Sequence, residues 1–419
     1  GMQGGIAIHI RRLVLPVYLP MVLLSVGMTA PVAAFPQYLA SLGASVAVVG
    51  VVISMRGVGN MVSDLPGGLI LGRVRLRIVV QVALLLASAA SAAMALIPHV
   101  AVIGALVVVM GTASSVMVTA MMTYVRISVP ADLRGRALSL TGGSVRIGAL
   151  VGPIAGGLLA DTFGVPAAIG LRAAAFFAAF VVFTMSPDRG IGAPGRARTR
   201  SREREAGDAA AERPGLAAQF RAIGAGLRGR GWALATVGFA ILMLQLLRAS
   251  RNIVLPLWGD ELELSATLIG SVMSAGAALE LALFIPAGII MDRAGRKVAA
   301  GLCIGIFSLG VFALSLAGSV PLFVVASLLI GLGNGFGSGI NMTIGTDLAP
   351  SGAVSEFLGL WRLFGDVGAA AGPAIVGSIA SAGGLPVAIV ATALFGVSGL
   401  VALLFAPETL KLAKSADDG

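Results

Sequence analysis

The amino-acid sequence predicts an all-helical integral membrane protein with twelve transmembrane helices, arranged as two pseudo-symmetric six-helix bundles. Composition is the first observation behind this prediction. Of the 419 residues, 57% are hydrophobic and only 11% are charged, and the mean hydropathy is +0.98, whereas a soluble domain carries about 25% charged residues. The second observation is an internal repeat, because residues 11–187 resemble residues 231–407 at a constant offset of 220 positions.

The two halves share the residues that interrupt or bend helices. The matched pairs include Pro36 and Pro256, Gly50 and Gly270, Pro66 and Pro286, Gly111 and Gly331, and Pro166 and Pro386. Glycine and proline fix where a helix kinks or where a neighbouring helix approaches closely, so shared positions indicate a shared bundle geometry. Two homologous halves of this kind are typical of a secondary transporter whose site lies between the repeats.

Twelve segments are apolar and long enough to span a bilayer, which takes about 20 residues. The first half contains the spans 13–39, 47–71, 78–97, 100–125, 137–160 and 166–185. The second half contains the spans 232–258, 266–291, 298–317, 321–347, 357–380 and 387–405. The predicted domains are an N-terminal bundle (11–187), a cytoplasmic linker (188–230), a C-terminal bundle (231–407) and a cytoplasmic tail (408–419).

Basic residues mark every second connection between spans. Examples are Arg73, Arg75 and Arg77 after the second span, and Arg293, Arg296 and Lys297 after the eighth. The alternate loops carry no Lys or Arg and hold His99, Asp161 and Asp260 instead. By the positive-inside rule both termini are cytoplasmic, in the inner (plasma) membrane of the cell. The net charge of +10 is mostly a consequence of this topology, so no nucleic-acid partner is expected.

Three motifs carry a family resemblance. Residues 286–297 read PAGIIMDRAGRK, which resembles the cytoplasmic loop signature of the major facilitator superfamily. In the fifth span, the antiporter signature of that superfamily's drug and metabolite exporters is matched at Gly148, Gly152, Pro153, Gly156 and Gly157. The segment 407–409 resembles the ending that many members show after the last span. The resemblance implies the superfamily fold and a place in the exporter branch, although the fifth-span glycines also suit a tight helix crossing with no role in transport direction.

The loop signature implies a role for its charged residues. In the superfamily its carboxylate latches the two halves together on the cytoplasmic side, which here points to Asp292 with Arg293 and Arg296. The first-half copy has Gly72 where the signature has an acid, so the latch is predicted to be one-sided. The alternative is a cluster that only sets topology.

Ionisable side chains inside the spans are functional hypotheses, because each costs at least about 2.5–3.5 kcal/mol at mid-bilayer. The polar candidates are Arg56, Asn60 and Asp64 in the second span, Arg146 in the fifth, Gln245, Arg248, Arg251 and Asn252 in the seventh, Glu280 in the eighth, Asn334 in the tenth, and Arg362 and Asp366 in the eleventh. Arg172, early in the sixth span, is expected to snorkel outward and to be structural.

Depth along the helices suggests how these charges pair. The resemblance places the fifth span against the eighth and the second against the eleventh. Residue depths then predict two interdomain ion pairs, Arg146 with Glu280 and Asp64 with Arg362, with Asp366 sharing Arg362. Purely structural pairing is the alternative, and so is an intrahelical pair between Arg362 and Asp366. Glu280 is the first choice for a proton-coupling carboxylate, followed by Asp366 and Asp64.

The cavity of such a transporter is predicted to favour an anion. Arg248 and Arg251 form a polar face with Gln245 and Asn252, and Arg56, Asn60 and Asn334 are further substrate-binding candidates. The first span contains no acid that would offset these guanidinium groups. An excess of guanidinium suits a carboxylate, phosphate or sulfonate. Alternatively, Arg248 or Arg251 pairs with Glu280 and needs no anion.

The sequence therefore predicts a monomeric secondary active transporter. Its predicted activity is proton-coupled export of a small amphipathic substrate, drug-like or a metabolite and possibly anionic or zwitterionic, by alternating access. An importer or facilitator of organic anions is one alternative, and a non-transporting sensor or lipid-binding protein on the same fold is another. No enzymatic activity, cofactor or metal site is expected, because the single Cys303 and the isolated His9 and His99 form no ligand set.

Overall fold

The computed structural model of the protein describes residues 13–73, 75–129, 131–186, 231–350 and 354–409, without the side chains of 64–73, 126–127, 131–136 and 354–356. The predicted linker lies outside these ranges, as does the tail from residue 410 onward. Within them, eleven helical segments are long and apolar enough to cross a membrane, or twelve when α12 and α13, which meet at a 45° bend, count as one span. The predicted all-helical class is confirmed.

The N-terminal bundle starts with a discontinuous first span. Its pieces are η1 (Val14–Tyr18), α2 (Leu19–Thr29), η2 (Ala30–Ala33) and α3 (Phe35–Ser41). Five long helices follow, namely α4 (Val46–Arg73), α5 (Leu76–Leu96), α6 (Val100–Ser128), α7 (Ala131–Phe163) and α8 (Val165–Met185).

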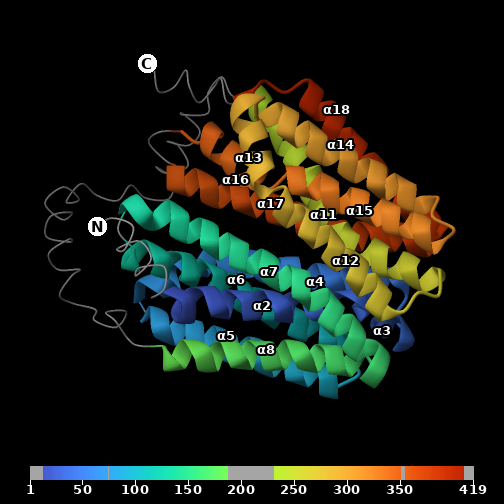
Figure 1. Ribbon diagram of the computed structural model, residues 1–419, viewed down its shortest axis with the longest axis horizontal. Helices are drawn as coiled ribbons and strands as arrows, with labels where there is room; N and C mark the ends of the chain where they lie inside the picture. Colours follow the sequence, from blue (N-terminus) through green and yellow to red (C-terminus); the bar gives the residue numbers. More distant parts are fainter. Residues whose placement is uncertain (1–12, 74, 130, 187–230, 351–353, 410–419) are drawn as a thin grey trace, which may run out of the picture.

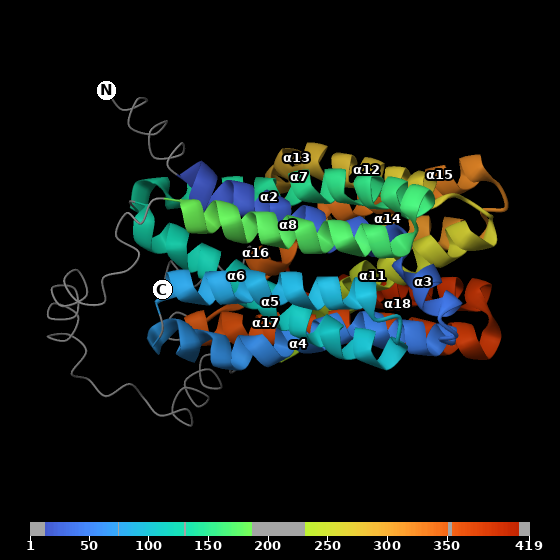
Figure 2. The same cartoon turned by 90° about the horizontal axis from the view of Figure 1, so that it is seen from below.

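The C-terminal bundle repeats this plan. It consists of α11 (Gly231–Glu261), α12 (Ala266–Ala282), α13 (Phe284–Arg293), α14 (Arg296–Ser315), α15 (Val320–Phe336), α16 (Ile340–Leu348), α17 (Val354–Gly383) and α18 (Leu385–Leu404). The two bundles lie side by side with their long helices running in the same general direction (Figures 1 and 2). Their most extensive mutual contacts are α4 with α17 and α7 with α12.

The tenth span is broken, although its sequence reads as one apolar segment. α15 ends at Phe336 and α16 begins at Ile340, and Gly339 between them has a left-handed φ of +80°. Glycine adopts this conformation without the steric cost that a side chain adds. A broken span leaves backbone carbonyls without helical partners, and such groups inside a membrane must find other donors.

The repeat also governs how the bundles touch. We call the contact surface between the two bundles the seam. A Cβ atom on Gly270 would clash with the carbonyl oxygen of Pro153 across the seam, and one on Gly50 would clash with that of Pro373. These two pairs are related by the 220-residue offset, so the close approach of α7 to α12 is repeated by α4 and α17. Only glycine allows backbones to come this near.

The two ends of the molecule differ in character. At the basic end, to the left in Figure 1, Arg296 and Lys297 begin α14 and hydrogen-bond Glu408 beyond α18 through their backbone N–H groups, at 2.9 and 3.1 Å. At the remote end, hydrogen bonds join the bundles, including one from Gln37 Nε2 to the carbonyl oxygen of Pro256 (2.7 Å). The basic end is the one predicted to be cytoplasmic.

Candidate functional site

A cavity of about 140 Å³ lies between the two bundles. Its wall draws on α2, α4 and α7 from the N-terminal bundle and on α11, α12 and α15 from the C-terminal bundle. The wall includes Pro153 and the polar or charged residues Thr29, Arg56, Arg251, Asn252 and Glu280. The close glycine contacts at Gly270 and Gly50 lie on its remote side. The cavity thus occupies the seam where the repeat predicts a site.

Glu280 forms an ion pair with Arg251 in this wall. Arg251 Nη1 lies 2.7 Å from Glu280 Oε1, and the side chains are 25% and 18% exposed. The amide of Asn334 also lies close to the Glu280 carboxylate. The structure therefore realises the alternative in which a seventh-span arginine neutralises Glu280. Arg251 Nε remains buried without a described partner.

Arg248 is held by three groups of its own bundle. Its Nε donates to Asn334 Oδ1 (2.7 Å), its Nη1 to Gln245 Oε1 (3.0 Å) and its Nη2 to the carbonyl oxygen of Gly337 (3.0 Å). The last bond satisfies a backbone carbonyl at the break of the tenth span. Gln245, Arg248, Asn334, Glu280 and Arg251 thus form one continuous polar chain. Sequence reasoning named all of them, but not the broken span that Arg248 completes.

The predicted pairing of Arg146 with Glu280 is not found in this structure. The guanidinium carbon of Arg146 lies 4.4 Å from the centre of the Phe284 ring, one turn beyond Glu280 on the eighth span. Its charge still interacts with Glu280 at longer range, across the seam. The prediction failed because depth along a helix does not fix direction around it, and Arg251 reaches the carboxylate from within the same bundle.

The remaining membrane charges lie in α4 and α17. The side chain of Asp64 is outside the described set, so its predicted pairing with Arg362 cannot be followed. Arg362 and Asp366 are half-buried one turn apart on α17, and each has an interaction partner. Asn60 is half-buried one turn from Arg56 and does not line either of the two cavities described here.

The fifth-span glycines pack against two other spans. Cβ atoms on Gly148, Gly152 and Gly156 would clash with α2 and η2, and one on Gly157 would clash with the backbone of Ala266. Pro153 lies inside α7 and lines the cavity. The packing of this motif therefore agrees with the interpretation of its glycines as the site of a tight helix crossing.

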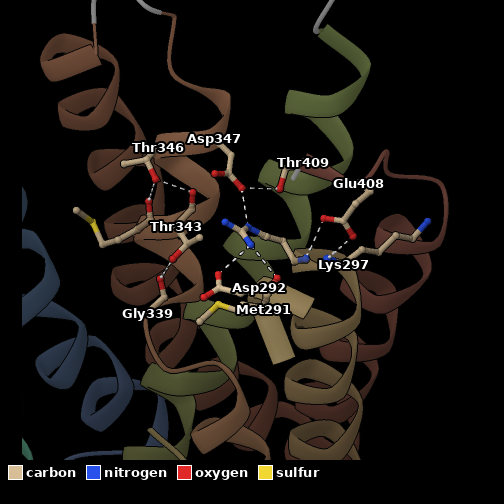
Figure 3. A network of polar contacts seen from close by, with 11 residues as sticks. Met291, Asp292, Lys297, Gly339, Thr343, Thr346, Asp347, Glu408 and Thr409 are labelled. Atoms are coloured by element: carbon tan, nitrogen blue, oxygen red, sulfur yellow. Dashed lines mark hydrogen bonds and ion pairs between the residues drawn. The ribbon is translucent and has the colours of Figure 1, made fainter. Parts of the chain in front are cut away.

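The charged loop after α13 binds within its own bundle (Figure 3). Arg296 pairs with Asp347 on α16 (2.9 Å) and with Asp292 (3.2 Å), and Thr409 donates to Asp347 (3.2 Å). Asp292 is 76% exposed, and Arg293 is also exposed. Sequence reasoning named Asp292, Arg293 and Arg296 but missed Asp347, which lies 51 residues away from Arg296.

Arg172 does not snorkel outward as expected. Its side chain is only 3% exposed and points into the N-terminal bundle, with its guanidinium carbon 5.6 Å from the centre of the Phe35 ring. Together with Arg56 it lines a second cavity, of about 60 Å³, next to the first. The expectation was wrong because the discontinuous first span leaves space beside Phe35 inside the bundle.

Two helical bundles around a polar cavity define the fold of a membrane transporter. The sequence matches the Major Facilitator Superfamily over residues 18–250 and 237–419, and the chain belongs to this family. No curated protein matches the sequence.

Solved structures share the fold at low identity. A D-xylose–proton symporter superposes with a TM-score of 0.73 and 15% identity, covering 96% of this chain and 99% of that one. A peptide transporter POT in complex with sulfate superposes with a TM-score of 0.72 and 17% identity, covering 98% of this chain and 94% of that one. A POT family transporter in complex with 5-aminolevulinic acid superposes with a TM-score of 0.72 and 13% identity, covering 93% of this chain and 95% of that one. At these identities the likeness concerns the fold alone.

Proposed function

We propose that the protein is a proton-coupled secondary transporter that exports a small amphipathic substrate by alternating access. Residues 11–187 and 231–407 act as the two rocking units, with the cavity between them as the binding site. The observation that carries the proposal is the Glu280–Arg251 ion pair in the wall of that cavity. A buried carboxylate beside a substrate cavity can take up and release a proton as its surroundings change.

The two arginines near Glu280 supply such a change. Arg251 belongs to the same bundle as Glu280 and moves with it, whereas Arg146 belongs to the opposite bundle. Rocking therefore alters the distance from Arg146 to Glu280 while the Arg251 pair persists. Approach of a cation favours release of the proton, and its withdrawal favours uptake. Asp366 and Asp64 remain secondary candidates for the same role.

The charge around the cavity supports an anionic or zwitterionic substrate. Arg56 and Arg251 line the wall, Glu280 is the acid among its lining residues, and Arg146 and Arg248 add positive potential nearby. Asn252 offers an amide in the same wall. Guanidinium groups in a low-dielectric site bind carboxylate or phosphate strongly. Arg56 and Arg251 line the cavity wall and Arg248 does not, so Arg251 and Arg56 are the stronger substrate contacts.

The direction of transport rests on the fifth-span signature. Glycines at 148, 152, 156 and 157 with Pro153 favour the exporter branch, whereas a proton symporter is among the proteins of similar fold. Import of an organic anion is therefore the second candidate. A sensor or lipid-binding protein on this fold is the third. We further propose a monomer in the plasma membrane with both termini cytoplasmic.

Flux measurements in proteoliposomes test this proposal. Purified protein is reconstituted, and the movement of labelled organic anions and zwitterions is followed with and without an imposed pH gradient. Accumulation driven by a gradient directed opposite to substrate movement supports proton-coupled export. Movement of proton and substrate in the same direction supports import, and no flux of any compound supports the sensor.

A further inference from the structure

A second cavity, of about 60 Å³, adjoins the first on the side of the N-terminal bundle. Its wall comes from the broken first span (including Phe35) and from α4, α6 and α8, with Asn252 of α11 as its contribution from the opposite bundle. The two cavities share Val32, Arg56 and Asn252, so Arg56 stands between them. The residues with charge in the second wall are Arg56 and Arg172, two cations.

Arg172 is poorly satisfied for a group this deeply buried. It is 3% exposed, its Nη2 donates to the sulfur of Met94 at 3.7 Å, and its Nε is buried with no described partner. A thioether is a weak acceptor. A charge removed from water without hydrogen-bonding or ionic compensation is costly. Arg56 lies close enough to Arg172 for the two charges to repel each other.

Among the side chains that the structure describes, no acid of the same bundle is placed to neutralise this pair. The sequence 13–186 contains the acids Asp64, Asp132 and Asp161. Asp161 is engaged with the start of α12, and Asp132 precedes the fifth span at the basic end. Asp64 follows Arg56 by eight residues, which is about 12 Å along a helix. Across the seam, Glu280 is already paired with Arg251.

We propose that Arg56 and Arg172 bind the anionic end group of the transported substrate in this second cavity, while the body of the substrate occupies the larger one. The identity of the ligand as a substrate rests on the proposed transport function; the anion site itself does not. The space suits a carboxylate, phosphate or sulfonate group and not the rest of the substrate. Two guanidinium groups provide directed donors for such an oxyanion.

The position of Asn252 adds a conformational consequence. Because this residue comes from the C-terminal bundle, the wall of the second cavity is complete only while the bundles stay together there. An anion bound to Arg56 and Arg172 therefore stabilises the arrangement described here over one in which the bundles have separated at this level.

Sulfate binding to the purified full-length protein tests the site. Sulfate is titrated against chloride at constant ionic strength, with binding followed by calorimetry and thermal unfolding. Wild-type protein should bind sulfate saturably. Arg172→Met and Arg56→Gln should each weaken sulfate binding at least tenfold, whereas Arg75→Gln, which removes an exposed arginine of the same bundle, should leave it unchanged.

The melting temperature without sulfate supplies a second readout. Arg172→Met replaces a weakly compensated charge by an apolar side chain of similar length beside Met94 and Phe35, so the melting temperature should stay level or rise. A lower melting temperature with unchanged sulfate binding would mean that Arg172 is structural, and the proposal would be overturned. Equal loss of sulfate binding in Arg75→Gln would also overturn it.

Failure of this site and failure of the transport function can be told apart. If sulfate binding follows the arginine variants but no compound moves in proteoliposomes, the site stands and the transport proposal falls. If transport of anions persists unchanged in Arg172→Met and Arg56→Gln, the substrate-binding role of this site falls and the transport proposal stands.

Discussion

Asp161 and Ser381 occupy equivalent positions in the two repeats, and each accepts a hydrogen bond from the first turn of a helix in the opposite bundle. Asp161 accepts from the backbone N–H groups of Ala266 (2.9 Å) and Thr267 (2.8 Å), and also from the Thr267 hydroxyl. Ser381 Oγ accepts from the backbone N–H of Ala47 at 2.8 Å. A helix start carries partial positive charge and unpaired donors, so both contacts cap a helix across the seam.

The charged cap should hold the remote end closed more firmly than the neutral one. A helix cap is worth about 0.5–2 kcal/mol, so Asp161→Ala should shift the population toward a remote-open arrangement by roughly two- to thirtyfold. Distances between spin labels at Ser41→Cys and Ser319→Cys, at exposed remote positions of opposite bundles, measure that shift. Asp161→Asn retains a capping side chain and should change less. A larger effect of Ser381→Ala than of Asp161→Ala would contradict the assignment.

The glycine contacts at the seam make a separate prediction. In Gly270→Ala the new methyl group meets the carbonyl oxygen of Pro153, and in Gly50→Ala it meets that of Pro373, so α12 or α4 must move away. Both variants should lengthen the distance between the same two labels. Gly170→Ala, whose added methyl group meets nothing within 4 Å, is the matched control. Unchanged distances in both seam variants would show that the backbones can yield locally.

The fold and the repeat could be predicted because both depend on patterns that are visible in the amino-acid sequence alone. Apolar length identifies spans, and the constant offset between Gly50 and Gly270 carries through to matched contacts in three dimensions. The members of the polar chain from Gln245 to Glu280 were each named as candidates, since a polar or charged group in an apolar span is conspicuous, but their connection to one another was not predicted.

The sequence could not show the direction in which a side chain points around its helix, nor which residues meet across the contact between the two bundles. The Arg146–Glu280 prediction used depth alone, and the inward turn of Arg172 depends on a gap that the broken first span creates. Asp161 was assigned only to a loop, because the helix start that it caps lies 105 residues away. One signal was available: position 161 and its repeat equivalent 381 both carry residues that favour helix caps.

In the polar network at the basic end, we expect Arg296 to contribute to stability and Asp292 to control access to the cavity. Arg296 is 11% exposed and pairs with Asp347, which is 10% exposed, so Arg296→Gln leaves a poorly hydrated carboxylate without its cation. Removing one partner of a buried pair costs about 3–5 kcal/mol, and thermal unfolding should register the loss. Asp292→Asn, at an exposed position, should leave the melting temperature unchanged and instead raise access to the cavity from the basic end.

The measurement for Asp292 is the labelling rate of a cysteine in the cavity wall, Val272→Cys, by a membrane-impermeant reagent added at the basic end. Arg293→Gln, at another exposed position of the same loop, is the control for stability. A fall in labelling with Asp292→Asn would exclude a latch that closes this end.

Glu280→Gln tests the coupling role most directly. The amide keeps the size of the side chain and can still accept a hydrogen bond from Arg251, but it cannot bind or release a proton. Substrate binding and exchange of labelled for unlabelled substrate should therefore persist, while accumulation driven by a pH gradient should be lost. Asp260→Asn removes an acid from an exposed remote position and should leave both activities intact. Because Arg251 keeps its charge in the variant, excess positive potential should also tighten binding of anionic substrates. Gradient-driven accumulation at the wild-type level in Glu280→Gln would assign coupling to another carboxylate, with Asp366 tested next.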